Sequence, residues 1–183
     1  AMTGTTASQA AIIGAEAAAR KLTKDDLPAI GTAFLESLQH GCAPENFLYI
    51  FSIVDALDFA FPQLEALRDV PAGPGDDYQE GNAFQHTLLV VKEYQNISPN
   101  DVPGLLGAVT HDIGKAHTDP TEPTPHHDHG KKGIEPAQNL AAHLDIEQYE
   151  TEMVQAAKHH MKMHDFLRFD YPRLLQFVDS LDD

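Results

Sequence analysis

Residues 101–115 read DVPGLLGAVTHDIGK, an apolar stretch that ends in a His-Asp pair and a lysine. We expect a helix here from about Asp101 to Asp112, with Asn100 as a candidate N-cap. Apolar residues before and after this stretch recur every three or four positions, the spacing that places them on the buried face of a helix. The alternating pattern of a strand is not found at any length. The sequence therefore predicts an all-α protein of about seven to nine helices.

Two segments rich in proline or glycine interrupt the helical pattern. We interpret residues 69–81 as a loop within one domain, because helical patterning resumes on both sides. Residues 114–128 carry three prolines, and a loop of this length inside a compact domain is often functional. Helices are expected at about residues 7–22, 23–39, 44–61, 62–67, 82–94, 101–112, 130–143, 147–165 and 171–182.

The composition is that of a globular and strongly acidic protein. Hydrophobic residues make up 42% of the 183, enough for one domain with a real core. Twelve Lys and Arg stand against 28 Asp and Glu, and the formal charge of −16 disfavours long nucleic acids and anionic membranes. No apolar run approaches the roughly 20 residues of a membrane span, and Cys42 is the single cysteine. We therefore expect a cytoplasmic protein without an intramolecular disulfide.

Eleven histidines are the unusual feature of the composition. The pair His111 and Asp112 is weak evidence by itself, since a solvated helix end would also explain it. Other groups of the same chemistry accompany the pair. His86 lies among apolar residues in an expected helix, and Asp179 is a carboxylate in another, where burial without a partner would be costly. Imidazole and carboxylate together suit Zn, Ni, Fe, Mn or Co, so the set is a candidate metal site.

This order of residues resembles the HD superfamily of metal-dependent phosphohydrolases. In that family a histidine, a His-Asp pair and a later aspartate bind the ion, and further histidines bind a second ion in some members. Carried over by position, the first ligands are His86, His111, Asp112 and Asp179, the added histidines are His129 and His160, and the phosphate-contacting lysine is Lys115.

Three segments narrow the resemblance. Residues 108–115, residues 125–133 and the pair His160 and His164 look like the HD domain fused to bacterial tRNA nucleotidyltransferases. The likeness covers roughly residues 44–183, which we expect to form the HD domain, with residues 1–43 as an N-terminal helical segment packed on its core. A glycine-rich turn followed by paired aspartates is not found, so neither the nucleotidyltransferase half nor CCA addition is expected.

The resemblance implies a metal-dependent phosphohydrolase of phosphomonoesters or phosphodiesters. The substrate would be a small nucleotide, a 2′,3′-cyclic phosphate or a short oligonucleotide end, and the cofactor one or two divalent ions among Ni, Mn, Mg, Fe, Co and Zn. Two alternatives stay open: a (deoxy)nucleoside triphosphate hydrolase, and a non-catalytic module that binds metal or nucleotide. The catalytic residues implied are Asp112, Lys115, His129 and His160, with His126 and His164 as candidates for further ligands.

The other histidines and the methionines have ordinary explanations. His40, His117 and His143 are expected to be structural or to face solvent. Met153, Met161 and Met163 are expected to fill the core rather than to line a binding surface.

Overall fold

The computed structural model describes residues 9–73, 81–119 and 126–164, together with Pro172, Arg173, Gln176 and Val178. Within these residues the fold is all-α and contains no β-strand, as expected. Seven helices have nine or more residues, and they are α1 (Gln9–Ala19), α2 (Leu27–His40), α3 (Glu45–Ile53), α6 (Ala83–Ile97), α7 (Val102–Thr110), α9 (Ile134–His143) and α10 (Glu150–His164). Single turns form α4 (Leu57–Ala60), α5 (Pro62–Glu65) and α8 (His129–Lys132), and 3-10 turns form η1 (Lys24–Asp26), η2 (Ile113–His117) and η3 (Glu147–Tyr149).

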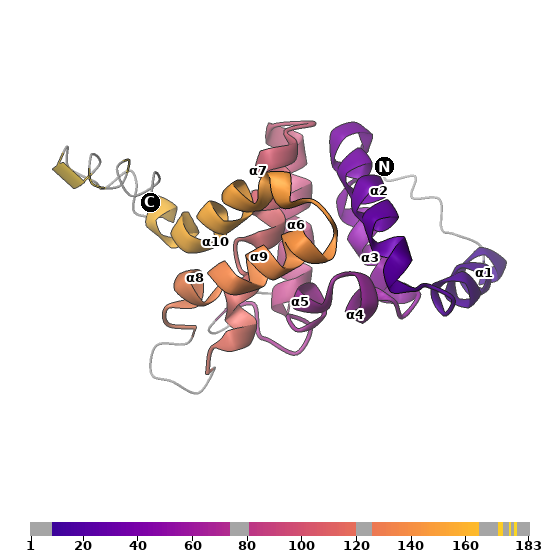
Figure 1. Ribbon diagram of the computed structural model, residues 1–183. Coiled ribbons are helices and arrows are strands. Elements are labelled where there is room, and N and C mark those ends of the chain that lie inside the picture. Colours follow the sequence, from indigo (N-terminus) through magenta and orange to yellow (C-terminus); the bar gives the residue numbers. More distant parts are fainter. Residues whose placement is uncertain are drawn as a thin grey trace.

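Helices α6 and α7 pack against each other in the middle of the bundle. Figure 1 shows α2 and α3 on one side of this pair and α8, α9 and α10 on the other. Helix α10 packs on both α7 and α9, and α8 packs on η2. The segments that follow α7 and precede α9 are thereby held beside α10. Among the described helices, none combines the length and the apolar character needed to cross a bilayer.

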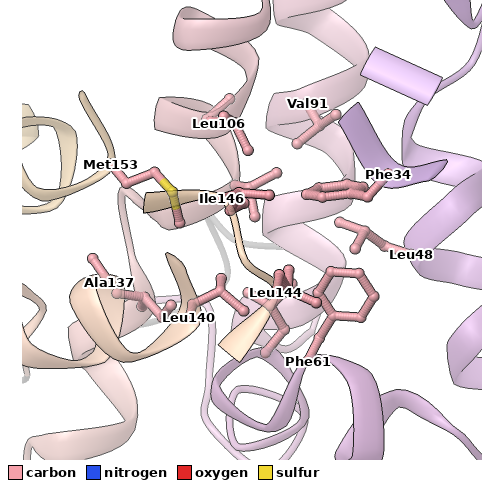
Figure 2. Close-up of a cluster of buried hydrophobic side chains, with 14 of the residues drawn as sticks. Phe34, Leu48, Phe61, Val91, Leu106, Ala137, Leu140, Leu144, Ile146 and Met153 are labelled. Carbon is pink, nitrogen blue, oxygen red and sulfur yellow. The ribbon is translucent and has the colours of Figure 1, made fainter. Parts of the chain in front are cut away.

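One hydrophobic core joins the N-terminal helices to the rest of the bundle. Phe34 of α2 is fully buried, and its ring lies 5.2 Å from that of Phe61 in an edge-on arrangement and 5.5 Å from that of Phe47. Figure 2 shows Phe34 and Phe61 in the same cluster as side chains of α6, α7, α9 and α10. Aromatic rings bury the largest areas in such cores, so this contact is a main support of the fold.

The chain breaks the expected helix at residues 44–61 into two. Helix α3 ends at Ile53, and α4 begins only at Leu57. Between them Asp55 has a φ of 56°, a left-handed conformation that a helix cannot include and that Asp tolerates better than most residues. Apolar periodicity continues across this break, which is why the sequence did not reveal it.

The start and end of α7 also differ from expectation. Asp101, not Asn100, caps the helix: its Oδ1 accepts a hydrogen bond from the Gly104 amide at 3.3 Å, while Asn100 is left-handed with a φ of 65°. The helix ends at Thr110, and the first residues of the expected loop 114–128 belong to the 3-10 turn η2, which ends at His117. The last expected helix, residues 171–182, lies mostly outside the described residues.

We expect Phe34→Ala to lower the free energy of unfolding by about 3–5 kcal/mol, because it leaves a cavity beside Phe47 and Phe61. Tyr49→Ala is the matched control, since Tyr49 is 46% exposed. The control should change stability by no more than about 0.5 kcal/mol. Urea unfolding followed by far-UV circular dichroism measures both, and equal losses would contradict the core described here.

Candidate metal centre

Five side chains from four segments meet next to the junction of α7 and η2. His86 lies near the start of α6, His111 directly follows α7, and Asp112 precedes η2. His129 begins α8, and His160 lies in the last part of α10. Their nitrogen and oxygen atoms form two groups, each of which could hold a metal ion: His86, His111 and Asp112, and Asp112, His129 and His160.

Close packing of the backbone brings these segments together. A Cβ atom added to Gly114 in η2 would collide with the carbonyl oxygen of His129 and lie 2.5 Å from the amide nitrogen of Gly133. Glycine at this position therefore lets η2 approach α8. On the other side, the Thr110 hydroxyl lies 3.0 Å from the carbonyl oxygens of both Leu106 and Met153, which joins α7 to α10.

The Asp112 carboxylate is the centre of the arrangement and is only 3% exposed. Its Oδ2 lies 3.2 Å from Nε2 of His111 and 3.7 Å from Nε2 of His86. Its Oδ1 lies 3.3 Å from Nε2 of His129 and 3.4 Å from Nε2 of His160. Each oxygen thus faces one pair of imidazoles, and Asp112 is shared by both groups.

Backbone carbonyls fix the orientation of three of the imidazoles. Nδ1 of His111 is 2.8 Å from the Ala108 oxygen, and Nδ1 of His129 and of His160 make the same kind of contact, at 2.7 and 3.0 Å, with the oxygens of His126 and Ala157. A carbonyl oxygen only accepts, so Nδ1 carries the hydrogen in each ring. Nε2, the ring atom that faces Asp112, can then bind a cation through its lone pair, or donate to the carboxylate when it carries a proton in place of the cation.

These lone pairs make the cluster suited to a cation. Nε2 of His129 and Nε2 of His160 are 2.8 Å apart, too close for a hydrogen on both atoms. A cation between the nitrogens and the carboxylate satisfies all of the acceptors at once. Ligands bound at 2.0–2.2 Å are separated from one another by roughly 3.0–3.4 Å in octahedral and tetrahedral sites. The distances around Asp112 are close to this range, so the donors fit a divalent ion in chemistry and in spacing.

The cluster also determines the charge of Asp112. Burial by itself raises the pKa of this carboxyl group, but where no cation is bound, hydrogen bonds from protonated Nε2 atoms among His111, His129 and His160 outweigh burial and hold the pKa well below its usual range. Asp112 is therefore ionised at neutral pH and contributes a negative charge to bind the cation.

The remaining predicted site residues have different surroundings. Lys115 is buried, with Nζ 2.7 Å from Asp112 Oδ2 and 2.5 Å from the carbonyl oxygen of Ala72. His126 is also buried, but its Nδ1 is 2.8 Å from the Thr118 hydroxyl, and it belongs to neither donor group. Asp179 and the side chain of His164 lie outside the described residues.

The residues predicted to be structural are outside the cluster. His143 contacts the carbonyl oxygen of Phe59 at 2.9 Å, and His40 and His117 are exposed. Met153 is fully buried as expected, whereas Met161 and Met163 are 51% and 53% exposed, so the expectation that they fill the core was wrong.

A groove with a volume of about 820 Å³ opens onto the cluster. The sequence did not predict it. His86, His111 and His160 all contribute to its lining. The rest of the lining is mostly apolar and comes from α6, α7 and α10, including Val90, Tyr94, Gly107, Ala108, Ala156 and Met163. None of the described residues that line it is Lys or Arg. No local motif marks this groove, because it forms only where three helices meet.

The fold and the cluster thus define an all-α protein with a buried His/Asp site that could hold metal. The chain is similar to part of bacterial proteins named multifunctional CCA protein. The relative from Mannheimia succiniciproducens is 31% identical over 145 residues, which cover 76% of this chain and 34% of the relative. Those from Psychromonas ingrahamii and Haemophilus influenzae are 32% and 33% identical, over 76% and 66% of this chain and 34% and 30% of their own length.

The chain therefore spans about a third of the length of the curated relatives it matches. These relatives agree with the resemblance to bacterial tRNA nucleotidyltransferases that the motifs indicated. No protein-family model matches the chain. No solved structure matches it either.

We expect Asp112→Asn to lose bound divalent metal, because this one carboxylate is common to both donor groups. Metal analysis of the purified protein and titration with Co²⁺ or Mn²⁺ measure the loss. Asp58→Asn is the control, since Asp58 is exposed and distant in sequence from every donor. Full metal content in the Asp112→Asn protein would refute the site.

Proposed function

We propose that the protein is a metal-dependent phosphohydrolase of the HD type, acting on a phosphomonoester or phosphodiester. The observation that carries the proposal is the sharing of the buried Asp112 carboxylate between two pairs of imidazoles. A centre in which one carboxylate faces two sets of nitrogen donors suits two ions about 3.5–4 Å apart, the arrangement of many phosphate-ester hydrolases. Asp179 is proposed as a further ligand of the first ion.

The chemistry follows from the side chains around the centre. Divalent metal held by these residues would lower the pKa of water and neutralise charge on phosphate oxygens. His111 and Asp112 would hold the first ion, and their orientation is fixed by the Ala108 carbonyl and by Lys115. His129 and His160 either bind the second ion or donate hydrogen bonds to the phosphate. A non-catalytic module would have no need of both donor pairs, which is why we favour an enzyme.

Similarity to the multifunctional CCA proteins supports a role in nucleotide chemistry. We propose that residues 44–183 form the hydrolytic domain and that residues 1–43 are an N-terminal helical segment packed on its core. Residues 27–38 of α2 contribute to the shared core, which supports packing of that segment on the domain. CCA addition is not part of the proposal.

The groove favours a nucleoside with a single phosphate group. A phosphate held near His111 and His160 can extend its organic group into the groove, because both residues line it. The apolar lining, with Tyr94 and Met163, suits a nucleobase better than a sugar phosphate. Without Lys or Arg in the described lining, additional phosphates in the groove would not be neutralised. A nucleoside monophosphate or 2′,3′-cyclic phosphate therefore fits better than a triphosphate.

A phosphate-release assay with metal-loaded protein tests the proposal. We expect His129→Ala to keep the fold and the first ion but to lose about 10²–10⁴-fold in turnover, the usual scale for an acid–base or electrostatic group. His127→Ala is the matched control, since the neighbouring His127 side chain is 62% exposed. A fall of one metal equivalent in His129→Ala indicates a second ion, whereas unchanged metal indicates phosphate contact. Unchanged turnover would exclude His129 from the active site.

The groove can be tested separately. Val90→Phe narrows it, and we expect the KM for a nucleoside monophosphate to rise about 10-fold, the scale on which apolar pockets discriminate. The value of kcat/KM for glycerol phosphate should not change, because its organic group is too small to fill the groove. Leu89→Phe places the same ring at the neighbouring position of α6, outside this groove. It should leave the kinetic constants for both substrates unchanged. Equal effects on the two substrates would contradict a role in specificity.

A further inference from the structure

Lys115 links the His/Asp cluster to a part of the backbone that is distant in sequence. Its side chain is only 9% exposed, and its Nζ lies between Asp112 Oδ2, at 2.7 Å, and the carbonyl oxygen of Ala72, at 2.5 Å. Ala72 is fully buried. The ammonium group thus serves two acceptors inside the protein, and one of them is a backbone oxygen that solvent cannot reach.

The backbone around Ala72 is hydrogen-bonded to the residues at the start of α6. The Ala72 amide donates to the Gly81 oxygen at 3.2 Å, and the Ala83 amide donates to the Val70 oxygen at 2.8 Å. Asn82 then caps α6 by accepting a hydrogen bond from the Gln85 amide at 2.9 Å. His86 follows these residues within α6. The hydrogen bond from Lys115 to Ala72 therefore holds the backbone that positions His86.

We propose that Lys115 is a positioning residue for the metal ligands and does not contact the phosphate. Its ammonium occupies one lone pair of Asp112 Oδ2 and leaves the other directed toward His86 and His111. Through Ala72 it also fixes the start of α6 relative to Asp112. The inference rests on the proposed metal centre and assigns the lysine a different role from the phosphate contact that the sequence motif implies.

Two observations argue against direct phosphate contact. Nζ is held between Asp112 and the Ala72 oxygen in a side chain that is only 9% exposed, and moving it outward to meet a substrate would leave the buried oxygen without this donor. Lys115 also does not line the groove that opens onto His86, His111 and His160. The lysine therefore contacts the carboxylate without lining the groove.

Charge-conserving and neutral substitutions separate the two roles. We expect Lys115→Met to weaken binding of Co²⁺ or Mn²⁺ by about 10–100-fold, the usual effect of removing a residue that orients a metal ligand. Lys115→Arg should not restore the affinity, because the larger guanidinium does not fit between Asp112 and Ala72. With metal saturating, the affinity for inorganic phosphate measured by calorimetry should stay within about 2-fold in both variants. Lys132→Met, at an exposed lysine of α8, is the control.

The outcomes distinguish this role from the metal centre itself. If the unsubstituted protein binds neither ion, the proposed function fails and the role of Lys115 fails with it. If that protein binds metal and Lys115→Met binds it equally well, the positioning role alone is overturned. Loss of phosphate affinity that Lys115→Arg restores would also overturn it. Should Lys115→Met unfold, Lys115→Gln, which keeps a neutral donor, is measured in its place and must show weaker metal binding.

Discussion

The buried Asp112 carboxylate is the constraint on which the rest of the site depends. A negative charge that is 3% exposed must be surrounded by positive or hydrogen-bonding groups, because burial without them is costly. Four imidazoles and one ammonium group meet this requirement, and they come from α6, the end of α7, η2, α8 and α10. The positions of these elements around α7 therefore follow from the surroundings that one carboxylate needs, as well as from the apolar core beneath it.

Small residues make this convergence sterically feasible. Gly114 allows η2 to touch α8, and Gly107 allows α7 to approach α10, where an added Cβ would lie 3.1 Å from Cβ of Ala156. The turn before His129 uses left-handed residues, His126 and Asp128, each with a φ of 59°. Such residues cost conformational energy, which is tolerated where a side chain must be aimed at a site. Gly104, Gly107 and Ala108 are among the residues that line the groove.

The sequence predicted the helices, and the residue types that meet at the candidate site, better than the connections between them. Apolar spacing predicted α6, α7 and α10. The motif around His111 and Asp112 led to four histidines, whose side chains the structure places around the Asp112 carboxylate. The break at Asp55 was missed because apolar residues continue through it. The bond from Lys115 to Ala72 could not be predicted, since a backbone carbonyl has no sequence signature. His126 has the residue type of a ligand, but its ring contacts Thr118, and only the fold distinguishes these two uses of an imidazole.

The acidic surface and a phosphate substrate are compatible because they act over different distances. At physiological salt a charge of −16 spread over the surface is screened beyond roughly 8 Å, so it weakly opposes a small anion that reaches the site. Inside the cluster, bound divalent ions would lie next to the phosphate, in surroundings of low dielectric constant where their charge is strong. A long polyanion would instead place many of its charges against the acidic surface, and it would contact the bound cations at only one point. The proposed small ligand, or the end of a chain, is therefore more compatible with this charge than an extended nucleic acid is.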